Sequence, residues 1–174
     1  GHESVARLLL ERRASIDAVQ KDNWTSLHLA AHYGHESVVG LLLERRASIN
    51  AANNDNWTSL HFAAQEGHES IVRLLLERGA SIDAVQKDNW TSLHFAAWKG
   101  HESVVRLLLE RGASINAATN DNSTSLHVAA ENGHESVVGL LLERRASIDA
   151  ANKNNVTSLH VAAENGHESV ARLL

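Results

Sequence analysis

The chain has 174 residues, a formal net charge of -5 at pH 7, and neither cysteine nor proline. This acidic balance lacks the basic face that nucleic-acid binding requires, so we expect no nucleic-acid partner. Without cysteine there is no disulfide framework, thiol nucleophile or cysteine-bearing zinc site, and we expect an intracellular, cytoplasmic location.

The sequence predicts neither a membrane span nor a secretory signal. No apolar run approaches the ~18 residues of a membrane span, and no secretory signal opens the chain, so we expect no membrane partner. The chain begins at Gly1 and contains no methionine, and residues 166–174 repeat residues 1–9. We therefore expect it to be a fragment of a longer protein or a processed form of one.

A period of 33 residues runs through the whole chain. A Thr-Ser-Leu-His segment recurs at Thr25, Thr58, Thr91, Thr124 and Thr157. A Gly-His-Glu-Ser segment recurs at Gly1, Gly34, Gly67, Gly100, Gly133 and Gly166. A fixed period of this length is typical of stacked repeats, in which each unit packs only on its neighbours. We predict one array with a part-unit over 1–19, units over about 20–52, 53–85, 86–118 and 119–151, and a final unit from 152 that stops at 174.

Each unit predicts the same elements in the same order. From Glu36, apolar residues recur at helical spacing as far as Glu44, which predicts an outer helix. The polar segment 47–56 predicts an extended turn or hairpin. Thr58 is a candidate N-cap for a short inner helix with a small alanine face, and Gly67 is suited to end that helix.

The run Asp-x-x-Thr-Ser-Leu-His-x-Ala-Ala-x-x-Gly-His-x-x-Val-Val-x-Leu-Leu-Leu resembles the ankyrin repeat, and the resemblance covers the whole chain. It implies an all-α solenoid of L-shaped helix pairs with β-hairpin-like loops. It also implies a non-enzymatic scaffold that binds a protein partner on a concave face made of loop tips and inner helices. Because the copies are nearly identical, the chain looks most like the tandem arrays of fungal NACHT/STAND-type receptors.

Three departures from the family pattern bear on stability. Serine replaces the usual proline after the threonine, which should cost stability, because proline is pre-organised for the first position of a helix. Asparagine replaces the loop glycine, and it tolerates left-handed backbone better than other residues. Arginine replaces the glycine after some outer helices, at a cost of about 1 kcal/mol if left-handed. The serines are Ser26, Ser59, Ser92, Ser125 and Ser158; the asparagines are Asn23, Asn56, Asn89, Asn122 and Asn155; the arginines are Arg13, Arg46 and Arg145.

The chain has twelve histidines, and eleven of them belong to the repeated framework. We expect those of Thr-Ser-Leu-His to hydrogen-bond the backbone or the capping threonine and to tie neighbouring loops together. Those of Gly-His should lie at the turn between helices. His35-Glu36 lacks the second histidine of a His-Glu-x-x-His zinc helix, since Val39 stands in its place. The serines lie in capping positions and no nucleophile elbow occurs, so we expect no catalytic residue, metal or cofactor.

The copies differ mainly at the loop tips and at the end of the inner helix, whereas the outer helix varies little. This contrast favours a loop side that was diversified for binding, although loops also tolerate change without any function. The predicted partner-binding residues are Lys21, Trp24, His32, Tyr33, Asn54, Trp57, Gln65, Glu66, Lys87, Trp90, Trp98 and Lys99.

Trp24, Trp57 and Trp90 hold equivalent loop positions, so we expect a ladder of tryptophans with steps of ~10 Å. We expect Phe62 and Phe95 to pack in the core instead. Tryptophan dominates binding hot spots, which favours a partner over the first three loops and a fold that survives removal of these rings. The alternative is that each tryptophan only wedges between adjacent loops.

Two other functions stay open. The end helices lack the polar capping repeats that such arrays need for solubility, which favours head-to-tail self-association in a structural or assembly role. The other is an engineered repeat-protein binder. The framework varies, as at Arg13 and Gly79, where a designer would have fixed one residue. Natural tandem duplication therefore fits the sequence better.

Overall fold

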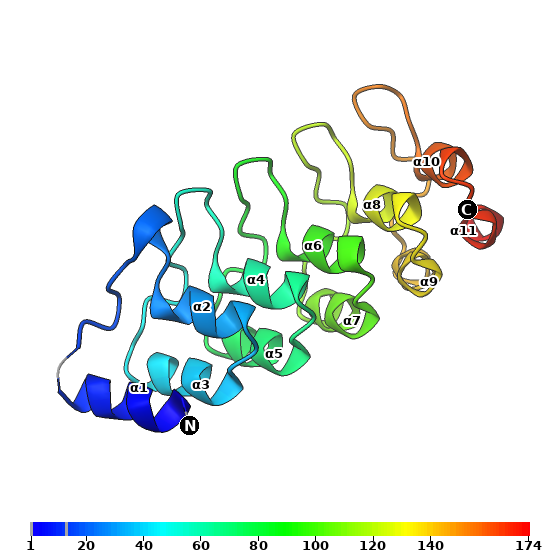
Figure 1. Cartoon of the computed structure of the whole chain (residues 1–174). Coiled ribbons are helices and arrows are strands. Elements are labelled where there is room, and N and C mark those ends of the chain that lie inside the picture. The colour runs from blue at the N-terminus through cyan, green and yellow to red at the C-terminus, as the bar shows by residue number, and fades with distance from the viewer. Residues whose placement is uncertain (1, 13) are drawn as a thin grey trace.

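The computed structural model describes residues 2–12 and 14–174. Two rows of helices lie side by side, and a row of loops projects beyond the inner row (Figure 1). The outer row is α1 His2–Glu11, α3 Glu36–Glu44, α5 Glu69–Glu77, α7 Glu102–Glu110, α9 Glu135–Glu143 and α11 Glu168–Leu173. The inner row is α2 Ser26–His32, α4 Ser59–Gln65, α6 Ser92–Lys99, α8 Ser125–Glu131 and α10 Ser158–Glu164. The chain is therefore an all-α stack of paired helices, as predicted.

The helices pack on their own pair partner and on the equivalent helices of adjacent units. Inner helices meet through fully buried alanine pairs such as Ala63 and Ala64, whose small side chains let neighbouring backbones approach closely. Leu60, Val72 and Leu75 are also buried, and they fill the space between the inner and outer rows. Small residues between the inner helices and larger residues between the two rows together form one continuous core along the stack.

The turn from an inner to an outer helix requires glycine. Gly67, which follows α4, has a φ of 75°, so the predicted end of this helix is confirmed. A Cβ atom at Gly67 would lie 2.8 Å from the ring of His101 in the next unit. Left-handed backbone and close approach thus both exclude a larger residue at this position.

The predicted backbone of the loop asparagines is confirmed, since all five have φ between 57° and 64°. Arg46 and Arg145 are left-handed as well, each with a φ of 66°. Arg13 lies outside the described residues. The first loop differs from the others because Asp22 is also left-handed, within the short 3-10 turn η1 Lys21–Asn23.

Backbone hydrogen bonds shape each loop and join it to the next one. In the second loop, Asn53 N–H donates to Trp57 O at 3.0 Å, which closes a hairpin-like turn. Asn54 N–H donates to Asp22 O of the preceding loop, also at 3.0 Å. A similar bond recurs at each later step, so the loops stand in a continuous row over the inner helices (Figure 1).

Among the helices in the described part of the chain, none is long and apolar enough to cross a bilayer.

Candidate functional site

At the base of the site, a threonine and a histidine hydrogen-bond to each other at the start of each inner helix. His28 N–H donates to Thr25 Oγ1 at 3.3 Å, and Thr25 N–H donates to His28 Nδ1 at 3.0 Å. Because Nδ1 accepts a hydrogen bond from Thr25 N–H, the neutral ring carries its own proton on Nε2, which donates to Ala51 O of the next loop at 2.9 Å. His61 repeats this arrangement and reaches Ala84 O at 2.8 Å. The predicted role of these histidines, tying neighbouring loops together, is confirmed.

Burial keeps His28, His61, His94 and His127 neutral. Desolvation lowers the pKa of His61 and that of His94 to about 4. It lowers the pKa of His28 and of His127 in the same direction. A protonated ring would turn Nδ1 into a donor and set it against the threonine N–H. These imidazoles therefore serve as fixed hydrogen-bonding groups near neutral pH.

The histidines of Gly-His position the ends of the inner helices. His68 Nε2 lies 3.0 Å from His32 O, and His101 Nε2 lies 2.9 Å from Gln65 O. His134 Nε2 makes the same contact with Trp98 O at 2.8 Å. Each acceptor carbonyl belongs to a residue that varies between copies. The hydrogen bond from the histidine to this backbone carbonyl therefore fixes the end of the inner helix in each of these units, whichever side chain the residue carries.

A ladder of aromatic rings runs along the base of the first three loops. Trp57, just before the cap of α4, lies 4.9 Å from Phe62 in the fourth position of that helix. This is a hydrophobic staple, which fixes how the loop enters the helix. Trp24 packs on the same Phe62 at 4.3 Å, and the next step repeats the pattern with Trp57–Phe95 at 4.2 Å and Phe95–Trp90 at 5.1 Å.

The ladder differs from the expected row of tryptophans alone. Phe62 and Phe95 are buried as predicted, but each of them also separates two tryptophans. A helical side chain leans toward the N-terminus of its helix, so the phenylalanine reaches between the loop of its own unit and the preceding loop. The ladder ends in the next unit, where Ser123 and Val128 occupy the two positions.

The other predicted loop residues lie at the tips. Lys21, Asn54 and Lys87 are all exposed. Lys87 Nζ lies 2.8 Å from Asp55 Oδ1 of the preceding loop, a residue that the sequence comparison did not select because it varies little. An exposed ion pair of this kind contributes little stability. The contact joins two adjacent loop tips.

The remaining predicted residues form the last turns of the inner helices. His32 Nδ1 lies 3.6 Å from Glu66 Oε1 of the next unit, and Lys99 Nζ lies 3.9 Å from the centre of the Trp98 ring. The ring centres of Trp24 and His32 are 6.0 Å apart, so the loop base meets the helix end. Trp90 and Trp98 repeat this contact at 6.2 Å, and Tyr33 and Gln65 lie at the same level of their helices. The structure thus brings the twelve predicted residues together on one surface, which we call the loop-side face.

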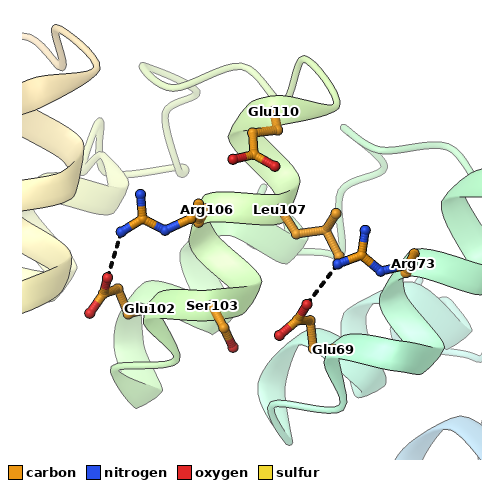
Figure 2. A pocket seen from close by; sticks show the side chains of 7 residues that line it. All are labelled: Glu69, Arg73, Glu102, Ser103, Arg106, Leu107 and Glu110. Atoms are coloured by element: carbon orange, nitrogen blue, oxygen red, sulfur yellow. Dashed lines mark hydrogen bonds and ion pairs between the residues drawn. The ribbon is translucent and has the colours of Figure 1, made fainter.

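The principal hollows lie on the other side, between outer helices. Figure 2 shows one of about 440 Å³ between α5 and α7. Arg73 pairs with Glu69 at 2.7 Å, and Arg106 pairs with Glu102 at 2.6 Å. Each of these pairs lies within one helix, four residues apart. Glu110, the other charged residue of the lining, lies 3.7 Å from Arg144 at the end of α9. The hollow has no convergent unpaired group that would bind a ligand.

Within residues 2–12 and 14–174, no cluster of three histidine, aspartate or glutamate side chains has the geometry to hold a metal ion.

Comparison with known families gives a consistent result along the chain. A family model of ankyrin repeats in three copies matches residues 49–119 and 114–174. A second model, of ankyrin repeats in many copies, matches residues 9–63. No curated protein matches the chain significantly.

Proposed function

Because the chain belongs to the ankyrin-repeat family, we propose that it is a non-enzymatic scaffold whose loop-side face binds a protein partner. Repeats of this family are generally protein–protein interaction modules and are typically not catalytic. One observation carries the proposal. Most residues that differ between copies lie on the loop-side face, above histidines and caps that are the same in every unit.

The proposal is tested by replacing exposed residues with those that later copies carry. Tyr33, Glu66 and Lys99 correspond to Asn132 and Asn165, so a triple asparagine variant keeps a side chain that the framework already accepts. A matched control, Gly40→Arg with Gly139→Arg, changes the outer helices to the residue found in the other copies. The parent and both variants are used to capture proteins from a lysate of the source cells. Loss of captured proteins with the triple variant alone supports the proposal, and retention by the triple variant contradicts it.

We also propose that the array comes from a receptor of the fungal NACHT/STAND type, on the near-identity of its copies. This proposal implies a cytoplasmic location, and the glycosylation state of the chain tests it. Every loop carries Asn-x-Thr, the acceptor signal for N-linked glycans, and all five asparagines are exposed. The intact mass of the chain purified from its own host should show no glycan. A glycan on any of these asparagines would place the chain in the secretory pathway.

End-to-end assembly is the second candidate, favoured by exposed apolar side chains on both end units. Leu8 and Leu9 of α1 are 52% and 55% exposed, and Leu159 of α10 is 46% exposed. However, residues 166–174 repeat residues 1–9. A second copy stacked in the 33-residue register would need its residues 1–9 in the place that 166–174 already fill. Seamless stacking of this 174-residue chain therefore requires one of these segments to leave its place.

A further inference from the structure

Two of the described arginines stand where the backbone favours glycine. Arg46 follows α3 and Arg145 follows α9, and each has a φ of 66°, whereas the equivalent Gly79 has a φ of 88°. Left-handed backbone is unfavourable for an arginine and carries no such penalty for a glycine. Both arginine side chains are exposed, and neither makes a hydrogen bond or an ion pair with any described residue. The fold gains no polar contact from these two arginines, which points to recognition by another molecule.

The left-handed arginine completes a short motif that only some of the copies carry. The sequence reads Arg-Arg-Ala-Ser-Ile where it ends at Ile49 and at Ile148, and Arg-Gly-Ala-Ser-Ile where it ends at Ile82 and at Ile115. The copy at residues 12–16 also carries the two arginines, but one of them lies outside the described residues. In the other four copies the serine is exposed. Two guanidinium groups ahead of an exposed hydroxyl suit a kinase whose substrate cleft is lined by carboxylates, because a guanidinium binds a carboxylate through two parallel hydrogen bonds.

The two serines that follow an arginine pair have different neighbours in the preceding unit. Ser147 N–H donates to Asn116 Oδ1 at 2.9 Å, and the hydroxyl of Ser147 has no hydrogen-bond partner among the described residues. Ser48 N–H donates to Asp17 Oδ1 at 2.9 Å, and the hydroxyl of Ser48 donates to Asp17 Oδ2 at 2.6 Å. The difference arises because an aspartate offers two acceptor oxygens and an asparagine only one. The hydroxyl of Ser147 is therefore free to react, whereas that of Ser48 must first leave Asp17.

Each of these serines lies in a short connection that leaves the end of an outer helix. Ala47 N–H donates to Leu42 O at 3.0 Å, and Ala146 N–H donates to Leu141 O at 2.9 Å. A kinase needs this connection to leave the helix end and enter its cleft. The left-handed arginine makes the folded connection less favourable than the glycine of the other copies does, so it favours local opening. The same residue thus offers a guanidinium group to the kinase and lowers the cost of reaching the serine.

We propose that Ser147 and Ser48 are acceptor sites for a serine kinase that selects a pair of arginines ahead of the acceptor. The serine Oγ forms a bond to the γ-phosphorus of ATP, the bond from that phosphorus to the bridging oxygen breaks and releases ADP, and the hydroxyl proton passes to a base of the kinase. Ser147 accepts phosphate faster than Ser48 because its hydroxyl is free. Both serines lie between an outer helix and the next loop (Figure 1) and not on the loop-side face, so this proposal is independent of the proposed function.

The chain contains a matched control for each site. Ser81 faces an asparagine as Ser147 does, and Ser114 faces an aspartate as Ser48 does, but a glycine replaces the second arginine ahead of both controls. The chain is incubated with ATP and the catalytic subunit of cyclic-AMP-dependent protein kinase, which selects such arginine pairs, and peptide mass spectrometry follows the phosphate on each serine. Ser147 and Ser48 should accept phosphate about tenfold faster than their controls, as expected from one lost charge-assisted hydrogen bond. Equal rates within each matched pair would overturn the proposal, and absence of phosphate from either serine would overturn its assignment.

Exchange of a single residue should remove one site and create another. Arg145→Gly should lower the rate at Ser147 about tenfold, and Gly79→Arg should raise the rate at Ser81 by about the same factor. Gly79→Gln is the control, since it places a side chain on the left-handed backbone without a guanidinium group. If Gly79→Gln raises the rate at Ser81 as much as Gly79→Arg does, easier opening alone explains the difference between copies, and the proposal is overturned.

Phosphate on Ser48 has a consequence for the joint between two units, because it places a second negative group beside the carboxylate of Asp17. A Ser15→Ala, Ser147→Ala variant confines the phosphate to Ser48 among the serines that follow two arginines. After phosphorylation of this variant, the amide of Ser48 should exchange its hydrogen about tenfold faster, because its hydrogen bond to Asp17 is lost. Asp17→Asn, which copies the residue at Asn116, should remove this increase. An unchanged exchange rate in the phosphorylated variant would show that the phosphate leaves the joint intact, and this consequence would then be wrong.

Discussion

At the scale of single residues, His28, His61, His94 and His127 each satisfy two backbone groups that are otherwise enclosed. His61 Nδ1 accepts from Thr58 N–H at 3.0 Å, and His61 Nε2 lies 2.8 Å from Ala84 O. A buried backbone group without a partner costs about 1–3 kcal/mol. Both contacts require a neutral ring with its proton on Nε2, so the charge state of this residue is coupled to folding.

Stability should therefore fall as the solution becomes acidic. The pKa of His61 and that of His94 are about 4 in the folded chain, below the ~6.5 of an unfolded histidine. Between these pH values the unfolded chain binds more protons than the folded chain. The contribution of the two histidines to the free energy of unfolding is therefore fully present above pH ~6.5 and is lost as the pH falls toward 4. Each histidine contributes on the order of 3 kcal/mol to this loss. Urea melts at pH 7.5, 6, 5 and 4.5 measure it.

A variant separates these histidines from the carboxylates that also titrate in acid. His61→Asn retains a side-chain acceptor near Thr58 but cannot be protonated in this range. It should be less stable at pH 7.5 and should show a shallower dependence of stability on pH. A pH slope equal to that of the parent would show that His61 is not responsible.

The serine after each cap offers a second prediction at this scale. Ser92 is the first residue of α6, is fully buried, and its hydroxyl has no hydrogen-bond partner. Thr91 before it is extended, with ψ at 170°, which is the conformation that a following proline requires. Ser92→Pro should therefore stabilise the array by roughly 0.4–1 kcal/mol. Urea melts measure this change, and a destabilised variant would mean that the ring does not fit beside the preceding helix.

At the scale of elements, one exchange, glycine in place of arginine, interrupts the pattern of the outer helices. Gly139 lies in the middle of α9, where a glycine costs about 1 kcal/mol relative to alanine. A Cβ atom at Gly139 would meet no atom within 4 Å, so packing does not require glycine there. The equivalent Arg106 in α7 pairs with Glu102 four residues earlier. Gly40 in α3 is a second case of the same exchange.

Gly139→Arg should accordingly stabilise the array by about 1 kcal/mol, mostly through helix propensity. The new arginine should also pair with Glu135, which adds a few tenths of a kcal/mol at low salt. Gly139→Ala isolates the first contribution, and thermal melts at low and high salt isolate the second. If the alanine variant is no more stable than the parent, the glycine has a packing role that the structure does not reveal.

Because of the hydrophobic staple between loop and inner helix, removal of a tryptophan should reduce stability as well as binding. Trp57 packs on Phe62 of its own unit and on Phe95 of the next, so it joins two units as well as facing solvent. Trp57→Ser, which copies Ser123, should cost about 2 kcal/mol because a large half-buried ring is lost. Trp98→Gln is the control, since the ring of Trp98 contacts Trp90 and Lys99 but no phenylalanine staple in the described part of the chain, and it should cost less than ~1 kcal/mol. If both variants lose the same small amount of stability, Trp57 does not support the fold and acts in binding alone.

These elements also show what the sequence could and could not predict. Period, caps and apolar spacing predicted the helix pairs because those features act within one unit, as at Thr58 and Gly67. The positions of Phe62 and Phe95 between tryptophans depend on the lean of a helical side chain and on the distance between units, which no single copy encodes. Pairing each residue before a cap with the fourth residue of its helix would have revealed the staples. The contact of His32 with Glu66 joins adjacent units through residues 34 positions apart, one more than the period, and no periodic pattern identifies it.

At the scale of the whole molecule, stability is distributed along one axis. The main contacts between helices join a unit only to its neighbours, and the N- and C-terminal ends lie at opposite ends of the stack (Figure 1). A unit in the middle is covered on both sides, whereas α1 and α11 are each covered on one. In such a nearly one-dimensional array, stability is approximately a sum of unit terms and interface terms. An end unit has one interface term fewer and should open first.

Hydrogen exchange should therefore show protection that rises from both ends toward the centre. Amides of α4, α6 and α8 should exchange slowest, and those of α1, α10 and α11 fastest, because opening an end unit breaks one interface and opening a central unit breaks two. Exchange followed by mass spectrometry on peptides from each unit measures this order. Repeating it at tenfold higher protein concentration tests end-to-end association, since partners that cover Leu8, Leu9 and Leu159 would raise protection only at the ends. Uniform protection along the chain would mean that the array opens as one cooperative block, and the one-dimensional description would then fail.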